Sequence, residues 1–163
     1  MIDVQTISIV LASCSFILAA SYYMLTLRNQ TKTRHMQIIQ GVSSRFSTPS
    51  FSWDFLDLTW QDYDDFMEKY GPLSGSEMYD SIVLWFDAFE LYGVYVREGM
   101  LNVRLICLTS GGTYLQSWEK FGPIWQEYRK RNDDPRWWIE AEYIYERMKE
   151  YFKQHPELHI KPE

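Results

Sequence analysis

The sequence predicts an all-α protein, with one N-terminal transmembrane helix that continues into a stalk and then a small bundle of four or five helices. Three observations support this prediction. An apolar run without charge occupies residues 4–27. After it, helix-starting and helix-ending residues separate segments whose apolar residues repeat at helical spacing. Alternating runs of period two, which would indicate strands, do not occur.

The run from Val4 to Leu27 is long enough to cross a membrane. It reads VQTISIVLASCSFILAASYYMLTL, and its roughly 24 residues reach about 36 Å as a helix, against about 30 Å of hydrocarbon. Tyr22 and Tyr23 stand near its far end, where aromatic rings suit the membrane interface. A cleaved signal peptide is the alternative, but it would have a basic start and a shorter apolar core. We therefore expect a transmembrane anchor over residues 1–27.

The charges beside this run predict its orientation. Only Asp3 precedes it, whereas Arg28, Lys32 and Arg34 follow it directly. Positive residues stay preferentially on the cytoplasmic side, where they also meet anionic lipid headgroups. The sequence therefore predicts a single-pass protein of the inner (cytoplasmic) membrane, with its N-terminus outside and its C-terminal domain in the cytoplasm.

Residues 28–47 are expected to form a juxtamembrane helical stalk. No proline or glycine interrupts the chain between Leu27 and Ile39. The anchor helix should therefore continue beyond the membrane towards Phe46, and Gly41 is a candidate for its end.

Two short helices should open a cytoplasmic helical domain over residues 48–155. Thr48-Pro49 supplies an N-cap and a first-position proline, which predicts a short helix ending at Leu58. Thr59 is the expected N-cap of a second helix, which ends near Tyr70.

The third helix is the expected centre of the core. Ser74 and Glu77 form a capping box at its start, and Gly99 closes it. A helix that is apolar nearly all round must be buried on most of its sides. The apolar residues on its main face are Met78, Ile82, Trp85, Phe86, Phe89 and Val96.

Asn102 is the expected N-cap of the next helix, which should break or kink at Gly122-Pro123. Asp134-Pro135 predicts a last helix that stops near His155, before a tail over residues 156–163. The apolar residues of this last helix form a single stripe, made of Trp138, Ala141, Tyr145, Met148 and Phe152.

The distribution of charge argues against nucleic acid as a partner. The formal net charge is -6, and residues 48–100 contain eleven acidic residues but only two basic ones, Lys69 and Arg97. Nucleic-acid binding requires a basic surface that neutralises phosphates. This acidic middle segment lacks one.

No familiar catalytic or metal-binding motif appears in the sequence. The three histidines do not form the Glu-x-x-His pattern of a di-iron bundle, and phosphate-binding and nucleophile-elbow motifs are absent. Cys14 and Cys107 cannot pair and are expected to be small buried residues. We expect no cofactor, no metal and no catalytic residue.

The most pointed polar feature is a set of charges on the apolar third helix. Asp87 and Glu90 share a face, and Arg97 lies two turns further on. A carboxylate pair could serve acid–base chemistry or bind a hard cation. Alternatively, these charges form a solvated seam or internal ion pairs with Arg104, Arg129 or Arg136.

A second set of residues is a candidate interaction surface. Asp62, Asp64 and Asp65 suit the start of a helix, and they could also bind a basic partner. Trp53 and Trp60 belong to an aromatic segment that could lie on the membrane surface or pack on the bundle. Aromatic residues make up 17% of the chain, and we expect them mostly in the core, with an interface as the alternative.

The order of the segments carries a family resemblance. An N-terminal span precedes SIVLWFDAFELYGVYVREGMLN, then LQSWEKFGPIWQEYRKR, then WWIEAEYIYERM. This order resembles an uncharacterised prokaryotic family of small, single-span membrane-anchored helical proteins, known only as a domain of unknown function. The resemblance implies the topology given above and no activity. The positions that carry it are Phe89-Glu90, Arg97-Glu98-Gly99, Trp118, Pro123, Arg129 and Glu142.

From these features we expect a membrane-anchored, non-enzymatic interaction protein, of the kind that serves as an accessory subunit of a larger membrane complex. Its expected partners are membrane lipid, through the span, and other membrane protein subunits. An enzyme or metal binder using the carboxylate pair is the alternative. A lipid-surface module is a second alternative.

Overall fold

The computed structural model describes residues 3–47 and 51–158. All regular structure in this part of the chain is helical, which confirms the predicted all-α class. The elements are α1 (Val4–Ser43), η1 (Ser44–Ser47), η2 (Trp53–Asp57), α2 (Tyr63–Tyr70), α3 (Glu77–Arg97), α4 (Val103–Thr109), α5 (Gly111–Asn132), α6 (Ile139–Gln154) and η3 (Pro156–Leu158).

The chain forms two compact units, of which the first ends at Ile38 and the second begins at Ile39. The helix α1 belongs to both, because it continues without a break beyond the apolar run, as predicted. Gly41 lies inside this helix and does not end it. Among the described residues, one helix is long and apolar enough to cross a membrane; it lies near the N-terminus, and no residue of its apolar window is buried.

The last turn of α1 is part of the second unit. Ile39 and Val42 are buried there, and the side chains of Ser43 and Tyr92 form a hydrogen bond. The ring of Phe46 follows at 5.2 Å from that of Trp85. The bundle therefore begins within the segment that the sequence predicts as a stalk.

Two helices start later than predicted. The N-cap of α2 is Asp62, whose carboxylate accepts a hydrogen bond from the amide of Asp65, and the N-cap of α3 is Ser76. Ser74 instead builds the preceding turn, because its hydroxyl accepts from the amide of Ser76 and donates to a backbone carbonyl. Thr48-Pro49 lies outside the described residues.

A break or a kink is predicted at Gly122-Pro123, and the break is wrong. Asn102 caps α4 as predicted, but the chain breaks at Ser110, and α5 then runs through Pro123 without interruption. A proline inside a helix removes one hydrogen bond and costs about 3 kcal/mol. Burial on both sides of the proline offsets this cost, since α5 packs the side chains of Trp118, Phe121, Ile124 and Trp125 into the core.

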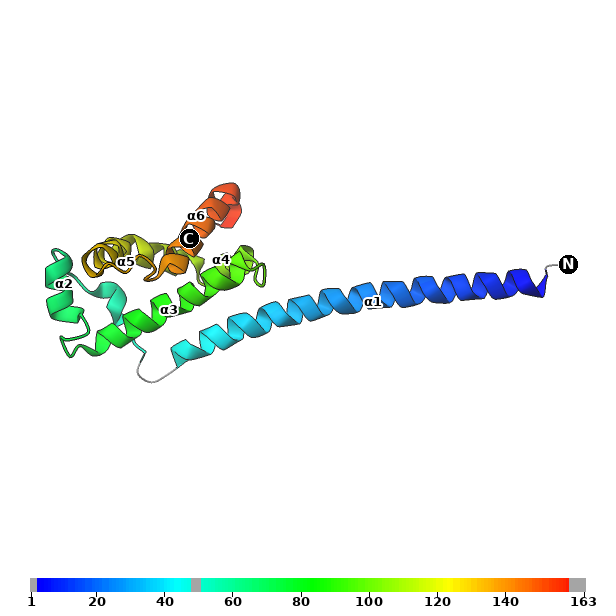
Figure 1. Cartoon of the computed structure of the whole chain (residues 1–163), viewed down its shortest axis with the longest axis horizontal. Helices are drawn as coiled ribbons and strands as arrows, with labels where there is room; N and C mark the ends of the chain where they lie inside the picture. Colours follow the sequence, from blue (N-terminus) through cyan, green and yellow to red (C-terminus); the bar gives the residue numbers. More distant parts are fainter. Residues whose placement is uncertain (1–2, 48–50, 159–163) are drawn as a thin grey trace. The chain divides into compact units, whose positions relative to one another are not determined.

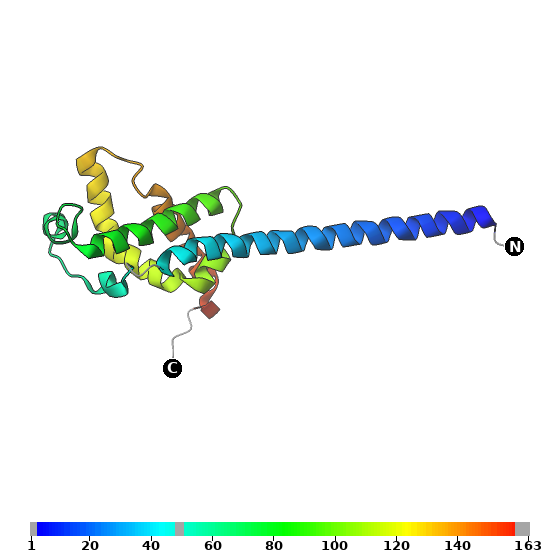
Figure 2. The same ribbon diagram turned by 90° about the horizontal axis from the view of Figure 1, so that it is seen from below.

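Helix α6 packs against α3, α4 and α5 (Figures 1 and 2). Its predicted stripe is buried throughout, which confirms the spacing argument. The core between these helices is mainly aromatic: the rings of Phe89 and Tyr114 stack at 3.5 Å, and the indole of Trp85 donates to the hydroxyl of Ser117 at 2.8 Å. The largest fully buried side chains are Trp85, Trp125, Tyr114, Phe55, Phe66, Phe86, Phe89 and Phe121.

Candidate functional site

The predicted polar residues of α3 face the start of α6. Gly93 lies among these residues on α3, and its position shows how closely α3 and α6 approach each other. A β-carbon at this position would come within 2.1 Å of the carbonyl oxygen of Glu140. Only a glycine allows the backbone of α6 to lie so near α3.

Glu90 caps the first turn of α6 from the neighbouring helix. Its Oε2 accepts a hydrogen bond from the amide of Ala141 at 2.8 Å, and the amide of Glu140 is a second backbone partner. The N-cap residue of α6, Trp138, makes no side-chain capping bond of its own. The first amides of a helix lack partners within the helix. Glu90 of α3 therefore supplies a hydrogen-bond acceptor that the N-cap residue of α6 does not provide.

The environment of Glu90 opposes its ionisation. Burial raises the pKa of this carboxyl above its usual value, and the nearby carboxylates of Glu140 and Asp87 act in the same direction. The hydrogen bonds from the amides of Ala141 and Glu140 act against this shift without cancelling it. The net direction is upward, because loss of water disfavours the charged form.

Asp87 holds the indole of Trp138. The Nε1 of that indole donates to Oδ1 of Asp87 at 2.7 Å. Trp138 is buried and has a left-handed backbone, with φ of 49°. This conformation is rare for a bulky residue and costs free energy. The bond to Asp87 is one of the interactions that hold Trp138 in place.

Arg97 binds a residue of α6. Its Nε lies 2.7 Å from Oε2 of Glu140, and its guanidinium stacks 3.9 Å from the ring centre of Tyr143. The arginine side chain is 48% exposed, so this ion pair contributes little free energy on its own.

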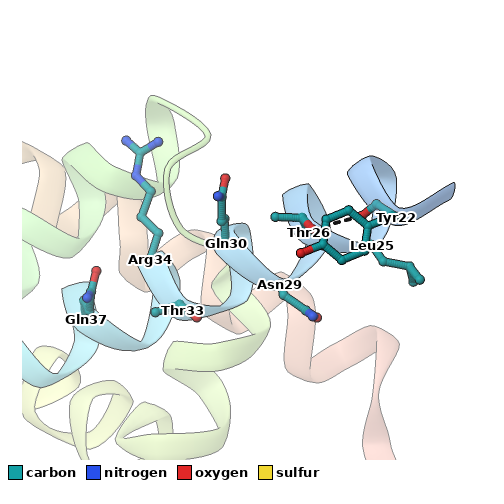
Figure 3. A pocket seen from close by; sticks show the side chains of 8 residues that line it. All are labelled: Tyr22, Leu25, Thr26, Asn29, Gln30, Thr33, Arg34 and Gln37. Carbon is teal, nitrogen blue, oxygen red and sulfur yellow. Dashed lines mark hydrogen bonds between the residues drawn. The ribbon is translucent and has the colours of Figure 1, made fainter. Parts of the chain in front are cut away.

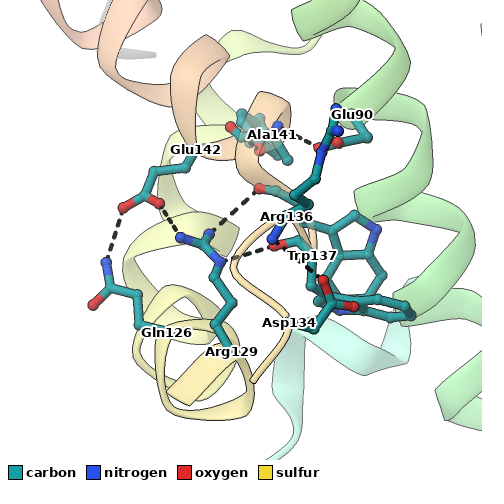
Figure 4. Close-up of polar contacts among 10 residues, drawn as sticks. Glu90, Gln126, Arg129, Asp134, Arg136, Trp137, Ala141 and Glu142 are labelled. Atoms are coloured by element: carbon teal, nitrogen blue, oxygen red, sulfur yellow. Dashed lines mark hydrogen bonds and ion pairs between the residues drawn. The ribbon is translucent and has the colours of Figure 1, made fainter. Parts of the chain in front are cut away.

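Arg129 of α5 holds the same junction from the other side (Figure 4). Its Nε donates to the carbonyl of Trp137 at 2.8 Å, and its guanidinium forms an ion pair with Glu142. Gln126 donates to the second oxygen of Glu142 at 3.0 Å. The side chain of Arg129 is only 13% exposed, so these bonds are shielded from water.

One of the readings offered for Asp87 and Glu90 pairs them with arginines, whereas the structure gives them backbone amides and an indole. Arg129 lies at the junction but binds Glu142 and the connecting loop. Sequence spacing could not show this, because the partners come from different helices. Four positions that carry the family resemblance meet here: Glu90, Arg97, Arg129 and Glu142.

An open depression lies beside this junction. It has a volume of about 460 Å³ and is lined by Gln126, Arg129, Lys130, Asp133, Pro135 and Glu142. Within the described residues there is no group of three histidine, cysteine or acidic side chains that could hold a metal ion. The arrangement as a whole fixes the start of α6 against α3 and α5.

The acidic candidates Asp62, Asp64 and Asp65 have partners within the chain. Asp62 caps α2, and Asp65 accepts from the amide of Gln61 at 2.9 Å and pairs with Lys69 at 2.8 Å. The carboxylate of Asp64 forms an ion pair with Arg131 of α5. These acids therefore help to form α2 and to hold it on α5.

The two tryptophans of the candidate surface have different places. Trp60 packs its ring between those of Phe66, at 5.0 Å, and Phe121, at 4.9 Å. Trp53 touches the ring of Trp85 at 5.0 Å, yet it remains 50% exposed. Trp53 is thus the member of the pair that is accessible to a partner.

The predicted membrane-interface residues all lie on the exposed surface of α1. Tyr22 and Tyr23 are 74% and 64% exposed. Arg28, Lys32 and Arg34 are exposed further along the same helix.

A family model described as a domain of unknown function, DUF4760, matches residues 4–148. The match covers most of the chain, so the protein belongs to this family, and the predicted resemblance to a family of unknown function is confirmed at that level. No curated protein and no solved structure matches the chain.

Proposed function

We propose that this member of the DUF4760 family is a membrane-anchored, non-enzymatic interaction protein of a prokaryotic inner membrane, serving as an accessory subunit of a larger membrane complex. The observation that carries the proposal is the apolar window of α1, of which no residue is buried within the chain. An apolar helix of this length requires a covering that the described residues do not supply.

The exposed side chains of α1 support a lipid covering. Phe16 and Leu18 are 75% and 70% exposed, and no charged residue lies between Val4 and Leu27. Leaving one large apolar side chain in water rather than burying it costs about 1.5–3 kcal/mol. A bilayer removes this cost along the whole run, whereas the core helix of a soluble protein would be buried by its own domain.

The continuity of α1 supports an anchor that stays with the mature chain. The helix runs without interruption from Val4 to Ser43, and its last turn buries Ile39 and Val42 in the bundle. A cleaved leader is separated from the folded domain by its cleavage site. Here the apolar run and the first core residues belong to a single helix.

The basic residues after the run support the proposed orientation. Arg28, Lys32 and Arg34 would lie in the cytoplasm by the positive-inside rule, with the bundle on the same side and the N-terminus outside.

A partner protein is the occupant that we propose for the surface around Trp53. Tryptophan is enriched where protein interfaces bury large amphipathic rings, and this one is half exposed at the edge of the aromatic core. Asp87 and Glu90 bind groups of α6, which favours a structural role over a catalytic one for these acids.

Membrane anchoring is tested by washing membranes that contain the full chain with alkaline carbonate. We expect the protein to remain in the pellet, and a C-terminal fluorescent fusion to report a cytoplasmic location. Replacing Arg28, Lys32 and Arg34 together by glutamine should reduce the fraction with this orientation. Release of the unmodified chain by carbonate would contradict the anchor.

The interaction role is tested by purification in mild detergent after chemical cross-linking of intact cells. We expect a co-purifying membrane protein whose yield falls in Trp53→Ala. The matched control is Leu73→Ala, which alters a residue that is 98% exposed in a loop. A lone protein, or equal yields from the two variants, would contradict this part of the proposal.

A further inference from the structure

One face of α1 carries a row of polar, uncharged side chains that begins at the end of the apolar run and continues beyond it. It consists of Tyr22, Thr26, Asn29, Gln30, Thr33 and Gln37, and we call it the neutral face. Figure 3 shows these side chains together with Leu25 and Arg34. All eight line an open depression along α1.

The spacing of the neutral face is that of a helix-pairing seam. Tyr22, Thr26, Asn29 and Thr33 follow one another at intervals of four, three and four residues. This pattern keeps side chains on the side of a helix that faces a partner in a left-handed pair. Gln30 and Gln37 flank the seam on one edge.

The charged residues of this segment lie off the seam. With 3.6 residues per turn, Arg28 and His35 project away from the line through Asn29 and Thr33, and Lys32 stands at its border. Arg34 lies beside Gln30 and lines the same depression, about a quarter of a turn from the seam itself.

These features suit a second copy of the same chain. Two copies that insert into one membrane in one orientation have parallel helices at the same depth, so identical residues meet. Opposed arginines or lysines would repel, whereas asparagine and glutamine carry both donors and acceptors and can pair with themselves. The hydroxyl of Thr26 already donates to the carbonyl of Tyr22 at 2.9 Å, so it needs no partner in such a seam.

The same intervals continue further towards the N-terminus of the apolar run. Ala19, Ser15 and Ala12 precede Tyr22 at steps of three, four and three residues. Small side chains at these positions let two helix backbones approach closely in lipid, which is consistent with a seam that extends beyond the neutral face.

We propose that α1 pairs in parallel with α1 of a second copy of this chain, through the neutral face. This inference rests on the proposed membrane anchoring, because the shared membrane sets the parallel arrangement. The pairing uses no residue of the Trp53 surface, so a dimer carries two copies of that surface.

Single cysteines test the pairing in the full-length chain, in a background with Cys14→Ala and Cys107→Ala. Thr26→Cys and Thr33→Cys place a thiol on the seam. The matched control is Thr31→Cys, on the opposite side of the helix; its hydroxyl, like that of Thr26, donates to the carbonyl four residues earlier. Membranes are treated with a mild oxidant, and the disulfide-linked dimer is measured on a non-reducing gel.

We expect several-fold more dimer from Thr26→Cys and Thr33→Cys than from Thr31→Cys, and mixed dimers when two differently tagged copies are co-expressed. Equal yields at the three positions, no dimer, or an adduct that never contains both tags would overturn the pairing. A carbonate wash of the same membranes separates the two proposals: retention without patterned cross-linking contradicts the pairing alone, whereas release contradicts the anchor.

A second measurement does not depend on cysteine. Thr33→Arg sets like charges opposite each other and should lower energy transfer between fluorescently tagged copies, whereas Thr31→Arg should not. Equal energy transfer in the two variants would also overturn the pairing.

Discussion

The carboxylate of Glu90 accepts a hydrogen bond from the amide of Ala141, 51 positions later in the chain. Helix α3 therefore caps helix α6. The αL residue Trp138 starts α6 without a capping side chain, so the stability of the last helix depends on a residue of another helix.

Removal of this cap should destabilise the bundle. We expect Glu90→Ala to lower the free energy of unfolding by about 1–3 kcal/mol, because buried amides lose their acceptor. Glu90→Gln should cost less, since its side-chain oxygen can still accept. Urea unfolding of the full chain in detergent, monitored by tryptophan fluorescence, measures the free energy of unfolding of both variants. Glu146→Ala, on the exposed face of α6, is the control, and an equal loss in that variant would contradict the capping role.

The pKa of Glu90 predicts how stability depends on pH. Because burial raises this pKa in the folded state, the folded chain binds the proton more tightly than the unfolded chain does. The resulting stability is fully present below the unfolded pKa and is lost as the pH rises through the folded pKa. Acidification from pH 7 towards the usual pKa of a glutamate should therefore favour the wild type over Glu90→Gln. If the free energies of unfolding of the wild type and Glu90→Gln differ by the same amount at every pH, this prediction is refuted.

The close approach of α3 and α6 predicts opposite effects for two glycines. In Gly93→Ala the new β-carbon meets the backbone of Glu140, so the helices must separate, at a cost of about 1–3 kcal/mol. Gly112→Ala meets nothing within 4 Å and lies in α5. It should stabilise, because alanine favours a helix, but by less than the roughly 0.5–1 kcal/mol of a mid-helix glycine, since Gly112 is the second residue of α5. Thermal unfolding of the two variants checks the signs, and a neutral Gly93→Ala would count against the close contact between α3 and α6.

The last turn of α1 should contribute to the stability of the bundle. Val42 is 3% exposed, and we expect Val42→Ala to cost about 1–3 kcal/mol through lost burial. Met36→Ala, at a position 58% exposed in the first unit, should have little effect. Urea unfolding of both full-length variants tests this. Equal stabilities would mean that the bundle begins after α1.

Cys107 should resist thiol reagents in the folded protein. Burial raises the pKa of its thiol to about 12, so almost no thiolate is present at pH 8. With Cys14→Ala in the background, labelling by a maleimide should be slow in the native chain and fast in urea. Fast labelling of the native protein would show that the region around α4 opens readily.

The sequence by itself determined the helices and most of what each one buries. The stripe from Trp138 to Phe152, the cap at Asn102 and the continuation of α1 past Leu27 were all predictable, because helix period and capping depend on neighbours within a few residues. The starts of α2 and α3 were missed by a few residues, since several hydroxyl and carboxyl side chains compete for each cap.

Tertiary structure decided the rest. Pro123 stays inside a helix because burial around it outweighs the lost hydrogen bond. Asp87 and Glu90, which the sequence left open between a chemical site and internal partners, bind the start of α6. Trp138 is held in its strained conformation by a residue of another helix. In these last two cases the partner is 51 positions away, and only the folded chain brings such groups within hydrogen-bonding distance.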